Sequence, residues 1–100
     1  MNKNIVFLTG FSGTGKTSVG RLAAELLGWM FVDMDEEISL ESGHDISQIF
    51  ANLGECAFRD LEHKKLLETV TGNNLIISTG GGILTNDKNQ KVMSESGITI

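Results

Sequence analysis

The chain has 100 residues, which is enough for one domain with a single hydrophobic core. Its composition, 40% hydrophobic and 21% charged, is that of an ordinary globular protein and argues against disorder. Because 13 Asp and Glu outnumber 8 Lys and Arg, the net charge of −5 argues against non-specific binding to nucleic acids or anionic membranes, which requires surplus cations.

The first third of the chain predicts a strand, a helix and a second strand. Residues 5–8 form a short apolar run that is typical of a buried strand. From Gly15 onward, apolar residues recur at three- and four-residue spacing, which predicts a helix that ends at Gly28. A second apolar run, residues 29–32, predicts another strand that ends at Asp33.

The middle of the chain predicts three consecutive helical segments. Asp35 is a candidate N-cap for the first, with acidic residues in its first turn, and Gly43 is its expected end. Asp45 is a candidate N-cap for the second, which Gly54 interrupts. Residues 55–71 then predict a further helix.

The last third predicts two strands around one helix, and the whole pattern indicates the fold class. Residues 75–77 read as a buried strand, a helix begins at Asn86 or Asp87, and residues 98–100 read as a fourth strand. Strands that alternate with helices predict an α/β domain with a largely parallel sheet. The chain stops inside an apolar run, so we expect residues 1–100 to form one domain that belongs to a longer one.

A phosphate-binding loop is the strongest motif. Residues 10–17, GFSGTGKT, match G-x-x-x-x-G-K-[ST] in full, between a predicted strand and a predicted helix. Backbone N–H groups in such a loop cradle phosphate oxygens at the positive end of the helix. Lys16 is expected to reach the β- and γ-phosphates and the Thr17 hydroxyl to ligate Mg²⁺. This context disfavours a plain glycine-rich turn and predicts nucleotide binding.

Two carboxylates follow the second predicted strand. Asp33 and Asp35 lie two residues apart, and in an extended chain this spacing points both side chains the same way. One could hold Mg²⁺ through water while the other binds an acceptor hydroxyl and takes its proton. Alternatively, Asp35 only caps a helix and Asp33 is a solvated loop residue. The spacing alone leaves both interpretations open.

Arg59 and the glycine triplet complete the list of candidates. Arg59 and Glu62 are spaced i,i+3, which by itself is typical of a surface ion pair. An arginine held by a carboxylate can instead present its planar fork to a substrate carboxylate. The triplet at residues 80–82 follows the third strand, where close approach of the backbone to a ligand explains three glycines better than a flexible turn does. Because ligands gather beyond the carboxyl ends of parallel strands, we expect one composite site.

Several other residues are interpreted as structural. Met30 and Met34 are expected in or near the core, and His44 and His63 at the surface. Cys56 has no activating neighbour in the sequence and is interpreted as a packing residue. A single cysteine cannot form an internal disulfide, and no secretory leader or membrane-length apolar run is seen, so we expect a cytosolic setting.

Taken together, these motifs resemble the amino-terminal part of the shikimate kinase family of P-loop kinases. Four segments carry the resemblance in the family's order: the phosphate-binding loop, FVDMD at residues 31–35, FRDLE at residues 58–62, and GGG at residues 80–82. The first is shared by many nucleotide-binding proteins, whereas the combination is far more specific. The resemblance covers nearly the whole chain and implies a P-loop-type parallel sheet flanked by helices.

The resemblance also implies roles for the candidate residues in ATP-dependent phosphorylation of shikimate to shikimate 3-phosphate. Asp33 is similar to the aspartate that contacts Mg²⁺ through water, and Asp35 to the residue that binds shikimate hydroxyls and is a candidate general base. Arg59, supported by Glu62, is similar to the arginine that binds the shikimate carboxylate. The implied nucleotide-binding residues, among them the catalytic lysine, are Gly13, Thr14, Gly15, Lys16, Thr17 and Ser18. The residues implied to line the shikimate pocket are Gly80, Gly81 and Gly82.

The family continues beyond this sequence with a lid that carries a catalytic arginine, a second shikimate-binding arginine and an adenine-binding loop. We therefore expect activity from the intact architecture rather than from these residues alone. Two alternatives stay open: a kinase for another small polyol acid such as gluconate, and a non-catalytic fragment that binds phosphate or self-associates. Family members are monomers, whereas an exposed final strand edge would favour self-association here.

Overall fold

In the part of the chain that the structure describes, four parallel strands form one sheet in the order β2-β3-β1-β4. The computed structural model describes residues 4–9, 16–80 and 82–100, with only the backbone of Lys16 and Thr17. The strands are β1 (Ile5–Leu8), β2 (Met30–Asp33), β3 (Leu75–Ser78) and β4 (Ile98–Thr99). The helices are α1 (Lys16–Leu27), α2 (Met34–Ser42), α3 (Ile46–Thr69), the short 3₁₀ helix η1 (Ile83–Thr85) and α4 (Asp87–Ser96). The predicted α/β fold is confirmed.

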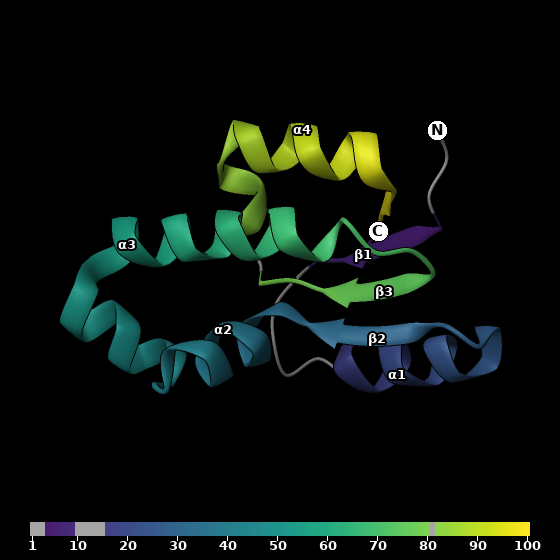
Figure 1. The fold of residues 1–100 in the computed structure, drawn as a ribbon, viewed down its shortest axis with the longest axis horizontal. Helices are drawn as coiled ribbons and strands as arrows, with labels where there is room; N and C mark the ends of the chain where they lie inside the picture. The colour runs from purple at the N-terminus through teal and green to yellow at the C-terminus, as the bar shows by residue number, and fades with distance from the viewer. Residues whose placement is uncertain (1–3, 10–15, 81) are drawn as a thin grey trace.

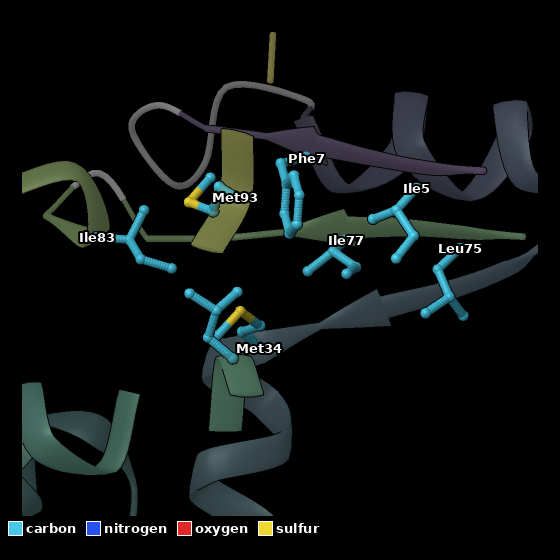
Figure 2. Close-up of a cluster of buried hydrophobic side chains, with 8 residues drawn as sticks. Ile5, Phe7, Met34, Leu75, Ile77, Ile83 and Met93 are labelled. Carbon is cyan, nitrogen blue, oxygen red and sulfur yellow. The ribbon is translucent and has the colours of Figure 1, made fainter. Parts of the chain in front are cut away.

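The helices cover both faces of the sheet, with α1 on one face and α3 and α4 on the other (Figure 1). Alternate residues of β1 and β3, including Phe7 and Ile77, pack against Leu66 of α3 and Met93 of α4. Figure 2 shows Phe7 and Ile77 side by side in this cluster. Burial of each such side chain contributes about 1.5–3 kcal/mol to folding. Because the strands alternate side chains between faces, this cluster occupies one face only.

The opposite face packs through a close approach of α1 to β2. Gly20 is buried, and a Cβ atom placed on it would lie 2.5 Å from Cε1 of Phe31. Ala24, one turn later, is also buried, whereas Leu22 and Leu26 are 57% and 78% exposed. Small residues therefore make the contact between α1 and the sheet. Met30 is 69% exposed, so its predicted place in or near the core is wrong.

Local signals end and begin most helices where the sequence predicts. Gly28 and Gly43 adopt positive φ angles of 72° and 77° directly after α1 and α2, a conformation that glycine adopts without strain. Asp45 caps α3 in a capping box with Gln48. Gly54 breaks the helical geometry inside α3 with φ 86°, as the predicted interruption required.

Three features differ from the sequence predictions or extend them. The turn η1 follows the glycine triplet and was not predicted. Asn86, one of the two predicted starts, is the N-cap of α4, and its side chain accepts a hydrogen bond from the Lys88 N–H. Cys56 is exposed, so it is not the packing residue expected from sequence. Among the described residues, no helix has both the length and the apolarity to span a membrane.

Candidate active site

The carboxyl ends of three strands lie side by side and bring the predicted segments together. In the register of the sheet, Leu8 of β1 and Asp33 of β2 both pair with Ser78 of β3. The Thr79 N–H continues this row by donating to the Leu8 carbonyl at 2.9 Å. The helices that follow β1 and β3 lie on opposite faces, which is the arrangement that opens a ligand crevice in parallel sheets. The candidate site therefore sits at this edge, as expected.

Much of the phosphate-binding motif falls outside what the structure describes. Gly13, Thr14, Gly15 and Gly81, for which the sequence predicts binding roles, lie outside the described residues, and so do the side chains of Lys16 and Thr17. Lys16 and Thr17 are the first two residues of α1, and Ser18 follows with an exposed side chain. The motif thus leads directly into the amino-terminal end of α1, where helix N–H groups favour an anion.

The two aspartates after β2 have different surroundings. Asp33 is the N-cap of α2, and its Oδ1 accepts a hydrogen bond from the Glu36 N–H at 3.2 Å. Asp35 lies in the first turn of α2 instead of capping it. The capping role predicted for Asp35 is therefore wrong, as is the premise that both aspartates lie in extended chain. The physical reason is that β2 ends at Asp33, where pairing with Ser78 stops.

Arg59 and Glu62 form an ion pair in which the acid is buried and the arginine is partly exposed. Arg59 Nη1 donates to Glu62 Oε1 at 3.1 Å, and the Glu62 side chain is only 2% exposed. The sequence pattern alone favoured a surface pair, and the burial of Glu62 shows that interpretation to be wrong. The guanidinium also lies 5.3 Å from the ring centre of Phe58 and 6.0 Å from that of Phe50. Its orientation is thus fixed by a carboxylate and two rings.

Opposing effects set the ionisation of Glu62. Burial raises the pKa of the Glu62 carboxyl, while the hydrogen bond and charge of Arg59 lower it. The negative charge of Asp35 raises the pKa of Glu62 further, so Asp35 lies close enough to interact. Two acidic groups and one cation therefore share this part of the molecule.

The glycines after β3 lie against the charged side chains. A Cβ atom on Gly80 would lie 3.4 Å from Oδ2 of Asp35 and 3.8 Å from Oε2 of Glu62. A Cβ atom on Gly82 would lie only 2.5 Å from Nη2 of Arg59, closer than atoms in contact can be. Gly82 thus lies close to a protein side chain, and the close approach of the triplet to a ligand stays a prediction. Asp35, Arg59, Glu62, Gly80 and Gly82 converge on one cluster, which we call the acid–arginine cluster.

Other residues around Arg59 were not selected from sequence. Glu55 Oε2 lies 3.9 Å from Arg59 Nη2, and the i,i+4 spacing of these residues was the available signal. No spacing in the sequence indicated Phe50. Its ring meets that of Phe58 because α3 bends at Gly54, and this bend changes which residues are neighbours. Within the described ranges, no group of three or more His, Cys, Asp or Glu side chains is arranged to hold a metal ion.

A surface cavity of about 190 Å³ lies apart from this cluster, between α2 and α3. It is lined in part by Leu61, Lys64 and Lys65. Lys65 forms ion pairs with Glu41 and Glu68, and the hydrogen bond from Lys65 lowers the pKa of Glu41. Lys65, one of the two lysines in the lining, is therefore already paired with protein carboxylates, and we assign no ligand to the cavity.

Comparison with known proteins points to one family over most of the chain. The family model described as shikimate kinase matches residues 12–100. A shikimate kinase from Persephonella marina is 48% identical over 96 residues, which are 95% of this chain and 58% of the relative. One from Thermodesulfovibrio yellowstonii is 47% identical over 96% of this chain and 55% of its own length. The chain thus spans little more than half of these relatives.

Solved structures agree in fold. A shikimate kinase from Acinetobacter baumannii in complex with shikimate superposes with a TM-score of 0.92 at 40% identity, over 97% of this chain and 54% of that one. Shikimate kinase from Aquifex aeolicus gives a TM-score of 0.87 at 39% identity, over 95% of this chain and 60% of that one. The matched family model, the relatives and the shared fold place this chain in the shikimate kinase family.

Proposed function

We propose that this chain supplies the phosphate-binding loop and part of the shikimate site of a kinase that phosphorylates shikimate with ATP. The observation that carries the proposal is the acid–arginine cluster at the carboxyl ends of the strands, next to where the phosphate-binding motif enters α1. It combines a cation for a carboxylate, an acid for a hydroxyl and close-packed glycines. Those are the groups that a hydroxylated carboxylic acid requires. The relative from Acinetobacter baumannii was solved with shikimate.

Arg59 is the proposed binding group for the substrate carboxylate. A guanidinium carries five N–H donors in one plane, so the bond from Nη1 to Glu62 leaves donors for a second carboxylate. Glu62 and the two aromatic rings hold the plane in position before substrate arrives. This preorganisation reduces the conformational entropy lost on binding.

Asp35 is the proposed acceptor for the substrate hydroxyl proton. In the proposed reaction the hydroxyl oxygen bonds to the γ-phosphorus, and the bond from that phosphorus to the β,γ-bridging oxygen breaks to release ADP. The hydroxyl proton passes to the Asp35 carboxylate, which lies half-buried beside Gly80. Lys16 and the loop N–H groups are proposed to stabilise the phosphate charge.

Asp33 and Thr17 are the proposed holders of Mg²⁺. Mg²⁺ prefers oxygen ligands and keeps several waters, so a hydroxyl and a nearby carboxylate form a suitable set. One Asp33 oxygen accepts the Glu36 N–H, and the carboxylate has a second oxygen for a water-mediated contact. When bound, the ion neutralises charge on the phosphates. The proposed nucleotide is ATP, and the proposed setting is the cytosol.

The decisive experiment measures transfer of the γ-phosphate from ATP to the acid. The chain is joined to the carboxyl-terminal residues of the Persephonella marina relative, and ³¹P NMR monitors Mg-ATP with shikimate, with gluconate or with neither. We expect a phosphoester signal with shikimate alone and its loss in a Lys16→Ala variant. A phosphoester with gluconate and none with shikimate would replace the proposal by the polyol-acid alternative. ATP hydrolysis that is indifferent to both acids would refute it.

Self-association and the domain limits also remain proposals. Strand β4 lies at the edge of the described sheet, with Ile98 67% and Ile100 72% exposed. An apolar edge of this kind favours pairing with a second copy of the 100-residue chain. Sedimentation at rising concentration tests this, and a constant monomer mass at high concentration would contradict it. We also propose that residues 1–100 belong to a single domain.

A further inference from the structure

Asn89 is a fully buried polar residue that the proposed function does not use. It lies in α4 and is 0% exposed. Its amide contacts two other elements: Nδ2 donates to the Ile83 carbonyl of η1 at 3.1 Å, and Oδ1 lies 2.6 Å from Nδ1 of His63 in α3. A buried amide needs such partners, because leaving its polar atoms unpaired is costly. Asn89 therefore links α4 to both η1 and α3.

The two contacts fix which atoms donate. The Ile83 carbonyl can only accept, so it must face the Asn89 amide nitrogen. The Asn89 oxygen then faces His63, whose Nδ1 must carry the proton and donate it. Both the Nδ1–H neutral tautomer and the imidazolium provide this bond. His63 was expected at the surface, yet it is only partly exposed and makes this contact.

The two anchor points are next to the acid–arginine cluster. Ile83 directly follows Gly82, which lies against the Arg59 guanidinium. His63 directly follows Glu62, which holds Arg59 from the other side. Asn89 therefore ties together the same two chain segments that meet around Arg59. A shift of either segment would change the space between Gly82 and the guanidinium.

Gln90 provides a matched comparison within the same helix. Its Nε2 donates to the Leu84 carbonyl, one residue beyond the Asn89 contact. Gln90 is exposed, and the hydrogen bond from its side chain reaches η1 and not α3. Both side chains thus join η1 to α4 through a hydrogen bond. Asn89 also contacts α3, the helix that carries Arg59.

We propose that Asn89, together with His63, is a positioning residue that sets the Arg59 guanidinium for the substrate carboxylate. The inference rests on the proposed function for the identity of the ligand. The positioning itself rests on the hydrogen bonds at Ile83 and His63. Asn89 acts through the placement of Gly82 relative to Arg59 and does not touch the substrate.

The test compares four variants of the chain, each joined to the carboxyl-terminal residues of the Persephonella marina relative. Asn89→Asp keeps an acceptor for His63 but has no N–H for the Ile83 carbonyl. His63→Leu removes the donor, whereas His63→Asn restores an N–H close to the position of Nδ1. Gln90→Ala is the control. Isothermal titration measures the dissociation constants of shikimate and of Mg-ATP for each variant.

We expect Asn89→Asp and His63→Leu to weaken shikimate binding by about tenfold or more, since the bond to the carboxylate is charge-assisted. His63→Asn and Gln90→Ala should stay within about threefold, and Mg-ATP affinity should not change in any variant. Equal effects of Asn89→Asp and Gln90→Ala, or a joint fall in both affinities, would overturn the proposal. If Asn89→Asp does not fold, the two His63 variants decide by the same criteria.

A second readout separates this inference from the proposed function. If the parent chain binds no shikimate when joined to the carboxyl-terminal residues of the Persephonella marina relative, the proposed substrate is wrong, and the Arg59 Nε–Hε NMR signal still tests the positioning. That signal should move in Asn89→Asp and His63→Leu and stay in place in Gln90→Ala and His63→Asn. An unmoved signal in the first two variants would overturn the positioning role.

Discussion

Replacing Gly82 with alanine tests whether the glycine triplet is required by the arginine that it contacts. The new Cβ atom would lie 2.5–2.8 Å from three guanidinium atoms of Arg59. To restore ordinary contact at 3.4 Å, the guanidinium must retreat by about 0.9 Å. A displacement of that size breaks the alignment that a charge-assisted hydrogen bond needs. The backbone can stay in place, because the displaced atoms are the end of a flexible side chain.

The expected effect is large on binding and small on stability. A hydrogen bond to a charged group contributes about 1.5–3 kcal/mol, so losing one weakens shikimate binding by about ten- to a hundredfold. The free energy of unfolding should change by less than about 1 kcal/mol, because the clash is relieved in a partly exposed side chain. Isothermal titration with shikimate and urea denaturation measure the two quantities.

A double-mutant cycle with Arg59→Ala provides the control. If Gly82 acts through Arg59, then Gly82→Ala should have no further effect on shikimate affinity in the Arg59→Ala background. An equal loss in both backgrounds would refute the reasoning. So would unchanged shikimate affinity in the single Gly82→Ala variant.

Three further perturbations test separate parts of the structure. Burial raises the pKa of the Glu62 carboxyl above its ordinary value of 4.5. The protonated carboxyl therefore contributes to stability below pH 4.5, and this contribution is lost as the pH rises through the higher pKa of the folded state. The free energy of unfolding of the parent chain minus that of Glu62→Gln should therefore fall over this window in urea titrations, and a constant difference would contradict the burial effect. Asp33→Ser should keep the α2 cap while Asp33→Ala loses about 1 kcal/mol, and both should weaken the Mg²⁺ dependence of ATP binding; equal stability would argue against the cap. Gly20→Ala should cost about 1–3 kcal/mol in denaturation experiments because its Cβ meets Phe31, and a neutral result would mean that the ring yields freely.

Local signals predicted much of the fold because they act through neighbouring residues. The capping box at Asp45 and the positive φ angle at Gly43 are set within a few residues, and both were readable from sequence. The shared edge for the candidate site also followed from strand alternation alone. The start of α2 was not predictable, because Asp33 and Asp35 are equally good caps. Pairing of β2 with β3 decides between them.

Tertiary packing decided what the local patterns could not. The spacing of Leu22 and Leu26 predicted the helix α1, yet Gly20 and Ala24 pack against the sheet because Phe31 fills the space there. Likewise, i,i+3 spacing places Glu62 beside an arginine on a helix but carries no information on burial. The approach of the segment after β3 to Glu62 makes it a buried acid.

Carboxylate recognition by Arg59 can be measured directly with NMR. The chain contains two arginines, Arg21 and Arg59, so a ¹⁵N spectrum of the Nε–Hε groups is simple, and Arg21→Lys assigns it. Shikimate and its methyl ester, which lacks the negative charge, are titrated into the labelled chain. We predict a saturable shift of the Arg59 signal with shikimate and none with the ester. An unmoved Arg59 signal, or equal binding of the ester, would contradict the proposal that Arg59 binds the carboxylate of shikimate.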